Sequence, residues 1–530
     1  MNYDIIPEYK IVFKDDCFNY YGTPNITSIA HALSYWGYLY TEKDTSNKTF
    51  FEESVGVVGI IKDDKKQYLI DKTIITELGV LRAWKSSFEA LGKDGLTSIN
   101  LSNNFNYLYR LIVKEQERCI REFEETSVKN MLMTLPVLSY LDNPNNEFFR
   151  LYYLFIKNRE LFTVKYSKQN YADIFSKFEA KYNMTLYEYM EALYLIIMCK
   201  CEANFIGLKK TRDLGKYNFL ISQNEFVDTN TKNKIRKALD MLSFDYNEAH
   251  IWSCATKEED FNFKLFQEKP LYKLTDEIYV PITRKYMQDQ SFNSLIYRIR
   301  SLYDSEDKSF WDLLGYLFEE YVEYIFQQAI KNIKYNYKII PKFNYGWKEG
   351  KKDSSDLIVI FDNNVCVFEL KSARPLNSIF SYDNEKKLDE SIDKVVKFPI
   401  KQCIKRTNEI VFSTVHNDLT EDKNYYFIAL TLGNFPDHYA DYSDIKATIK
   451  ESKLKIKGLF NFSIEEFELL CGAIEQDRKK LVDYLEEYKQ LPAHFSFKNY
   501  ISKKVDKSAK KNYFNELEED LKKFTDKINF

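Results

Sequence analysis

Two short apolar stretches with charged residues at their ends, Asp356 before the first and Glu369 and Lys371 in the second, constrain the fold of this 530-residue chain more than any other feature. Leu357–Phe361 and Val365–Lys371 are separated by the turn-forming triplet 362–364, so they are predicted to pair as a β-hairpin. Strand alternation places Glu369 and Lys371 on the same face as two valines. Charges on an apolar face need partners, because burying an unpaired charge is costly. The hairpin therefore predicts a polar site.

An amphipathic helix precedes this hairpin. Ser309 with Asp312 is predicted to cap its start, and the apolar residues then recur at helical spacing. These apolar residues are Phe310, Leu313, Leu314, Leu317, Phe318, Tyr321, Val322, Ile325 and Phe326. Helical geometry places Glu319 at one border of the apolar face and Glu320 at the other. Either acid is thus a candidate to reach the polar site.

The charges of the hairpin fit metal-assisted cleavage of phosphodiester bonds. Asp356 heads the first strand and Glu369 lies near the end of the second, so both can converge on Mg²⁺, which prefers oxygen ligands. The backbone carbonyl of Leu370 can join them. Lys371 would orient or activate the attacking water and offset the charge that develops on phosphorus. The alternative is a sheet-edge strand with a solvated Glu369–Lys371 pair, in which Asp356 only caps a turn.

Asp356, twelve intervening residues and then Glu369-Leu370-Lys371 resemble the D-x(n)-E-x-K core of the PD-(D/E)XK nuclease superfamily. The order of helix, strand and strand is similar too, although Ser355 stands where the family's nominal proline would be. The resemblance covers about residues 309–480. It implies a C-terminal α/β restriction-endonuclease-like core, with a central mixed sheet flanked by helices.

Two further residues enter the candidate site through this resemblance. Gly315-x-x-Phe318-Glu319 is similar to the family's G-x-x-F-E form, in which a helix glutamate completes the metal site, so Glu319 is favoured over Glu320. Gln402, in a predicted helix from Phe398 to Asn408, matches a polar residue that faces the family's site; an ordinary surface glutamine is the alternative. The implied catalytic residues are Asp356, Glu369, Lys371, Glu319 and Gln402, and the implied metal ligands are Asp356, Glu369, Leu370 and Glu319.

The resemblance also implies an activity. It indicates a Mg²⁺-dependent nuclease, with Mn²⁺ as a substitute, in which DNA is favoured over RNA and endonucleolytic over exonucleolytic cutting. Bacterial defence against phage or foreign DNA is the expected setting, with the N-terminal region regulating the enzyme or positioning its substrate. The alternative is a catalytically inactive nucleic-acid-binding or scaffolding protein that retains the fold. A homo-oligomer or a regulatory partner is left open.

The acid-x-Lys pattern alone does not single out Glu369-Leu370-Lys371. It recurs at Asp63-x-Lys65, Glu385-x-Lys387, Glu421-x-Lys423 and Glu451-x-Lys453. Those four lie in polar stretches or outside the helix-hairpin arrangement, so context separates the candidate from them. Arg374, just beyond Lys371, is either a phosphate contact or an ordinary loop arginine.

The whole chain is predicted to be an α+β multidomain protein whose N-terminal region is mainly helical with small β-hairpins. The predicted parts are a mixed α/β region (1–100) with a hairpin of strands 55–61 and 67–70, a mainly helical region (101–303), the nuclease-like domain (304–480) and a charged helical tail (481–530). Strands Lys264–Leu274 and Ile278–Ile282 are predicted to form a second hairpin, and a strand is predicted over Asn424–Leu432. Thr185 with Glu188 and Ser463 with Glu466 predict two capping boxes.

The composition of the chain limits which partners and which cellular compartment are expected. The net charge of −3 gives no overall basic field for nucleic acid, although a carboxylate metal site is locally acidic before its cation binds. Eight cysteines without a CxxC pair favour the reduced thiols of a cytoplasmic protein. No stretch approaches the roughly 20 apolar residues that span a bilayer, so no membrane partner is expected. Heavy use of Lys, Asn, Ile and Tyr is typical of an AT-rich bacterial genome.

Overall fold

The structure is a computed structural model whose described residues form two compact units. It describes residues 26–39, 76–91, 108, 111–112, 115, 144–157, 173–211, 219–226, 229–346, 351–372, 390, 393–433, 445–476, 479–492 and 495–505. Those up to residue 148 and from 173 to 302 belong to the first unit, and those from 149 to 157 and from 303 onward to the second. Both units combine helices with a sheet, so the predicted mixed α/β class is confirmed.

The first unit is mainly helical in its described part, with a four-stranded sheet of order β1-β4-β3-β2. The strands are β1 (Ile221–Ser222), β2 (Ser243–Phe244), β3 (Leu271–Lys273) and β4 (Ile278–Pro281). The helices are α2 (Ile26–Leu39), α5 (Glu77–Ala90), α10 (Ile174–Tyr182), α11 (Leu186–Tyr194), α12 (Ala203–Thr211), α13 (Thr229–Leu242), α14 (Tyr246–Ala255), α15 (Lys264–Glu268), α16 (Arg284–Asp289) and α17 (Asn293–Arg300), and α8 (Pro144–Leu151) leads into the second unit. The predicted Thr185–Glu188 capping box opens α11.

The predicted hairpin near residues 264–282 is confirmed only in its second half. Strands β3 and β4 pair antiparallel across the turn at 275–277. Lys264–Glu268, however, forms the helix α15 instead of a strand, with Leu265 and Phe266 buried. A short apolar run can bury its side chains in either conformation, so periodicity did not decide the case. The hairpin predicted for strands 55–61 and 67–70 lies outside the described residues.

A mixed sheet forms the centre of the second unit. In the described part of the chain it has five strands in the order β11-β10-β9-β8-β5. They are β5 (Lys338–Pro341), β8 (Leu357–Phe361), β9 (Asn364–Lys371), β10 (Asn424–Thr431) and β11 (Lys455–Ser463). The predicted hairpin is the antiparallel pair β8–β9, and its turn residue Asp362 has a φ of 46°. Strand β10, also predicted, joins β9 and β11 in parallel.

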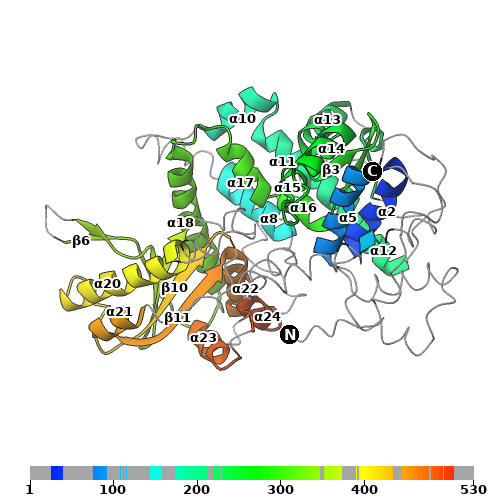
Figure 1. The fold of residues 1–530 in the computed structure, drawn as a ribbon. Coiled ribbons are helices and arrows are strands. Elements are labelled where there is room, and N and C mark those ends of the chain that lie inside the picture. Colours follow the sequence, from blue (N-terminus) through cyan, green and yellow to red (C-terminus); the bar gives the residue numbers. More distant parts are fainter. Residues whose placement is uncertain are drawn as a thin grey trace, which may run out of the picture. The chain divides into compact units, whose positions relative to one another are not determined.

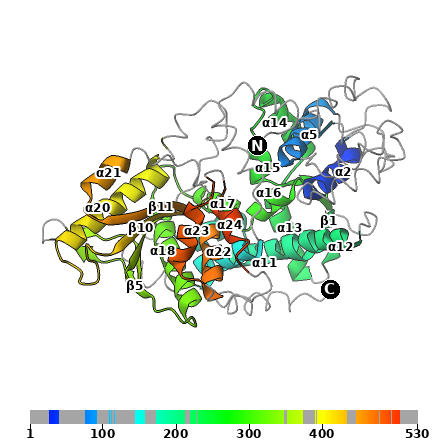
Figure 2. The same ribbon diagram turned by 90° about the horizontal axis from the view of Figure 1, so that it is seen from below.

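Helices cover both faces of this sheet. They are α18 (Ser309–Ile330), α20 (Phe398–Phe412), α21 (Lys446–Glu451), α22 (Ile464–Glu475), α23 (Leu481–Lys489) and α24 (Phe497–Ile501). On one face, the ring of Phe368 in β9 meets Phe467 of α22 at a centroid distance of 5.7 Å. On the other face, Glu369 meets Cys403 and Arg406 of α20. Figure 1 shows α20 running beside β10, and Figure 2 shows α22 grouped with α23 and α24.

Helix α18 begins where predicted, but its start is stabilised differently. Ser309 does not cap the helix; instead its backbone N–H donates to Asp307 Oδ1 at 2.9 Å. The predicted capping by Ser309 with Asp312 is therefore wrong, because the polar residue that precedes the first turn reaches its free amide. All nine predicted apolar residues of this helix are buried. The Ser463–Glu466 capping box of α22 is confirmed.

Within the described ranges, no helix has both the length and the apolar character needed to cross a membrane. A short two-stranded ribbon, β6 (Asn344–Tyr345) with β7 (Lys352–Asp353), stands between β5 and β8 along the chain. It is attached to α20, because Tyr345 and Lys352 both donate to the Glu409 carboxylate. The ribbon is thus held against α20 and ends at Asp353, three residues before Asp356.

Candidate active site

The two hairpin acids lie where β8 begins and β9 ends. Asp356 directly precedes β8, and its Oδ2 accepts a hydrogen bond from the backbone N–H of Leu370 at 2.8 Å. Glu369 lies on the neighbouring strand β9, and only 2% of its surface is exposed. In an extended strand the N–H and C=O of one residue point to the same side, so the Leu370 carbonyl also points to the side of β9 on which β8 and Asp356 lie. The register of β8 and β9 thus brings these predicted ligands together.

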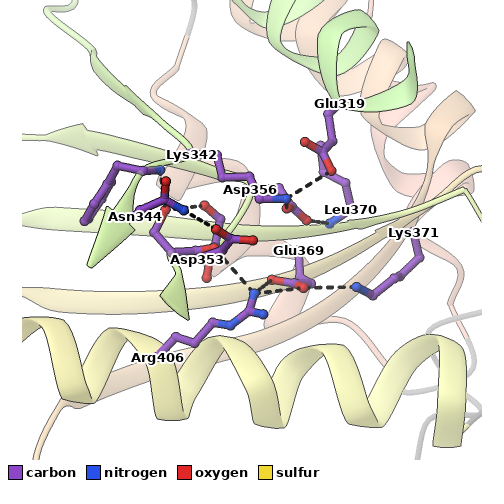
Figure 3. A network of polar contacts seen from close by, with 12 residues as sticks. Glu319, Lys342, Asn344, Asp353, Asp356, Glu369, Leu370, Lys371 and Arg406 are labelled. Carbon is purple, nitrogen blue, oxygen red and sulfur yellow. Dashed lines mark hydrogen bonds and ion pairs between the residues drawn. The ribbon is translucent and has the colours of Figure 1, made fainter. Parts of the chain in front are cut away.

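Glu369 is held by two cationic groups and an amide. Lys371 Nζ lies 3.0 Å from Glu369 Oε1, and Arg406 Nη1 lies 3.3 Å from both carboxylate oxygens. The amide of Gln402 is assigned with its nitrogen toward Glu369, because only this orientation lets it donate to Oε1, at 3.1 Å, and accept from Arg406 Nη2. Figure 3 shows Arg406 reaching this carboxylate from α20. The charges predicted on the apolar strand face are therefore paired rather than solvated.

Two other carboxylates, those of Asp356 and Glu319, share one ammonium group. Lys342 Nζ lies 2.9 Å from Asp356 Oδ1 and 3.3 Å from Glu319 Oε1, so it bridges the strand acid and the acid of α18. Strand β5 explains its position, since its last residue, Pro341, pairs with Leu357, and Lys342 follows directly after β5 as Asp356 directly precedes β8. In Figure 3, Glu319 descends from its helix toward Asp356. The structure thus brings Glu319 to the site, as the resemblance implied.

Crowding of the acids perturbs their protonation. Burial, and next the Asp356 carboxylate, raise the pKa of Glu319 to about 7, against the opposing effect of Lys342. Burial and the same Asp356 carboxylate also raise the pKa of Glu369. Burial lowers the pKa of Lys342, but the Asp356 and Glu319 carboxylates outweigh it and hold that pKa above its usual value. The negative charges repel each other, and an added cation between them would relieve that repulsion.

The donor set suits a hard divalent cation. Carboxylate and carbonyl oxygens are the ligands that Mg²⁺ prefers, and here two carboxylates already converge on one cation, the Lys342 ammonium. No three His, Cys, Asp or Glu side chains are gathered as a ready metal cage in the part of the chain that the structure describes. With Lys342 between them, the acids are spaced for an ammonium group. The residues therefore fit a metal, provided that Lys342 yields its place.

The structure brings the predicted residues Asp356, Glu369, Leu370, Lys371 and Glu319 into one cluster (Figure 3). The predicted Gln402 joins this cluster through its contact with Glu369. Arg374 lies outside the described residues. Sequence reasoning missed Arg406 and Lys342. Arg406 follows Gln402 by four residues, so helical spacing on α20 could have found it. Lys342 gave no signal, because the sequence predicted no strand between the helix that begins at Ser309 and the strand that begins at Leu357.

Comparison of the chain with protein-family models, with curated proteins and with solved structures found no match. Any function of the chain must therefore be inferred from the geometry and the chemistry of the site.

Proposed function

We propose that the chain is a metal-dependent nuclease with a restriction-endonuclease-like core in its second unit. The observation that carries the proposal is the convergence of Asp356 and Glu319 on one cation, beside the buried Glu369 carboxylate and its partner Lys371. A solvated surface pair does not account for it, because the Glu369 side chain is only 3% exposed. The mixed sheet, whose β8–β9 hairpin comes after α18 along the chain, supports the same core.

Each residue then has a defined part in hydrolysis. Asp356, Glu319 and the Leu370 carbonyl would hold Mg²⁺ or Mn²⁺, with Glu369 completing the set. When bound, the cation would act as a Lewis acid that lowers the pKa of a water molecule and polarises the phosphate. The Lys371 ammonium, with its side chain 32% exposed, can orient the attacking water and offset negative charge on the phosphate oxygens. Arg406 and Gln402 position the Glu369 carboxylate.

Substrate and biological role follow from the resemblance rather than from the geometry. DNA is proposed over RNA and endonucleolytic over exonucleolytic cutting, in a cytoplasmic enzyme. Defence against phage or foreign DNA is proposed on the same ground, with the first unit regulating the enzyme or positioning its substrate. One fold can support many activities, so the proposed substrate and role rest on the resemblance, whereas the proposed chemistry rests on the residues of the site.

The test is cleavage by the purified chain of plasmid, linear duplex, single-stranded DNA and RNA, with Mg²⁺, Mn²⁺ or EDTA. We expect metal-dependent cutting that falls by about 100-fold or more in Asp356→Asn and in Lys371→Ala, as for loss of a group that stabilises transition-state charge. Asp362→Asn, in the exposed turn of the same hairpin, and Lys338→Ala, on β5, are matched controls that keep activity.

Cutting that survives in both site variants would refute the assignment. If the wild type binds DNA but neither cuts it nor takes up metal, the inactive nucleic-acid-binding alternative is favoured. Calorimetry with Mn²⁺ separates that outcome from a nuclease that needs an activator, because the latter binds metal through Asp356.

A further inference from the structure

Lys342 differs from the other cationic groups of the cluster in the acids that it contacts. Lys371 and Arg406 both bind Glu369, whereas Lys342 binds Asp356 and Glu319. Its ammonium lies 2.9 Å from the first acid and 3.3 Å from the second. Two carboxylates from different elements thus share a single positive charge, at the place where the proposed activity needs a metal ion.

Lys342 can leave this position, while Asp356 is fixed. The lysine side chain is 34% exposed, against 5% for the aspartate. Lysine carries a hydrated ammonium on a flexible stem, so the head can turn into water, where hydration offsets part of the two ion pairs that it loses. Asp356 cannot follow, because its other oxygen accepts the Leu370 N–H. Lys342 also follows the last residue of β5 and lies outside its strand ladder.

Charge balance indicates that a metal and Lys342 compete. With every group ionised, three carboxylates face three cationic groups, and the cluster is neutral: Glu319, Asp356 and Glu369 against Lys342, Lys371 and Arg406. A divalent ion added to this neutral cluster would leave an excess of positive charge in a partly buried place. Departure of one ammonium reduces that excess, and Lys342 is the group that the incoming ion would touch.

We propose that Lys342 is an internal counter-ion of the metal site, which holds Asp356 and Glu319 together in the metal-free protein and is displaced when a divalent cation binds. The inference rests on the proposed function. Its consequence is that the chain binds metal more weakly than its oxygen ligands alone would, but keeps a stable site without metal. The lysine thereby sets the metal concentration at which the site loads.

The experiment compares Mn²⁺ affinity in the wild type, Lys342→Met and Lys342→Arg by calorimetry on the full chain. Methionine keeps an unbranched stem and removes the charge, so we expect about tenfold tighter binding, because no ammonium has to be displaced. Arginine keeps the charge and should leave the affinity within a few-fold. Lys338→Met is the matched control, since this lysine lies on β5, four residues before Lys342, but pairs with Asp418 outside the site.

Thermal unfolding supplies a second readout that does not depend on activity. In EDTA, Lys342→Met should unfold about 2–4 °C below the wild type, because Asp356 and Glu319 lose their counter-ion. Saturating Mn²⁺ should remove that difference, since binding to the folded state adds stability that grows with the logarithm of the affinity, and the variant is expected to bind more tightly. Lys338→Met should show neither effect.

The outcomes separate the inference from the proposed function. Tighter Mn²⁺ binding by Lys342→Met with a metal-rescued loss of stability supports displacement. Unchanged or weaker binding by this variant, with wild-type binding still lost in Asp356→Asn, overturns the counter-ion role and leaves the metal site standing. Absence of Mn²⁺ binding in both the wild type and Lys342→Met overturns the metal-dependent function together with the inference.

Discussion

Glu369 is the residue at which structure and proposed function are hardest to separate. Its carboxylate is almost fully buried and is contacted by Lys371, Arg406 and the Gln402 amide. A buried ion pair is weak evidence for stability as such, since its desolvation opposes the Coulomb attraction. Such a costly arrangement is instead typical of functional sites, where perturbed acids cluster. The pairing is therefore evidence for a site and not merely for a stable strand.

Removing Arg406 tests how far Glu369 depends on its partners. We expect Arg406→Met to lower the free energy of unfolding by about 1–3 kcal/mol, because the carboxylate keeps Lys371 but loses one buried partner. Urea unfolding followed by circular dichroism measures the change. In the background of Glu369→Gln the same substitution should cost clearly less, and equal costs in the two backgrounds would show that the two residues are not coupled.

At the scale of elements, the predictable part of the fold was set by local pattern. Helix α18 follows from its periodic apolar face, and strands β8, β9 and β10 follow from short apolar runs whose residues are nearly all buried. Strand β5 was missed, since its four residues end in a proline and bury only Ile340. Its role comes from antiparallel pairing with β8, which no local pattern encodes. The position of Lys342, and hence the cation between the acids, was for this reason not predictable.

The start of α22 offers a test of an element that the sequence did predict. Ser463 Oγ accepts from the backbone N–H of Glu466, and Glu466 Oε2 accepts in return from the Ser463 N–H at 2.8 Å. We expect Ser463→Ala to lower the free energy of unfolding by about 1 kcal/mol through loss of this cap. Ser413→Ala, at the exposed end of α20, should change it by less than about 0.5 kcal/mol. Equal losses in the two variants would contradict the capping role.

At the scale of the whole chain, the second unit is not a continuous segment. Its main part begins at Tyr303, next to the boundary expected at residue 304, but residues 149–157 belong to it as well. Arg150 in that early stretch forms a bidentate ion pair with Glu468 of α22, at 2.9 and 3.0 Å. The two residues are 318 positions apart, so neither composition nor periodicity could reveal their pairing. The polar residues 304–308 mark where the second unit's main segment begins, but they do not show which earlier segment packs with it.

Arg150 should therefore matter to the unit that carries the site, although it lies far from the site in sequence. Glu468 is fully buried and also accepts from the Tyr321 hydroxyl at 2.7 Å, which ties α18 to α22. Removing one partner of a buried pair leaves a desolvated charge, so Arg150→Met should destabilise the second unit by about 3–5 kcal/mol. Hydrogen exchange of the β9 and β10 amides in the full chain measures this, with exposed Lys157→Met as the control.

The same pair predicts the behaviour of a fragment cut at the boundary that the sequence suggests. A chain that starts at Tyr303 keeps Glu468 and loses Arg150, so its sheet amides should exchange as fast as those of Arg150→Met or faster. Adding Glu468→Gln removes the buried charge and should restore part of the protection in both backgrounds, because a neutral amide costs less to bury. If the fragment is as protected as the full chain, the early stretch is dispensable. Nuclease activity measured on such a fragment then reports on the folding of the second unit as much as on regulation by the first.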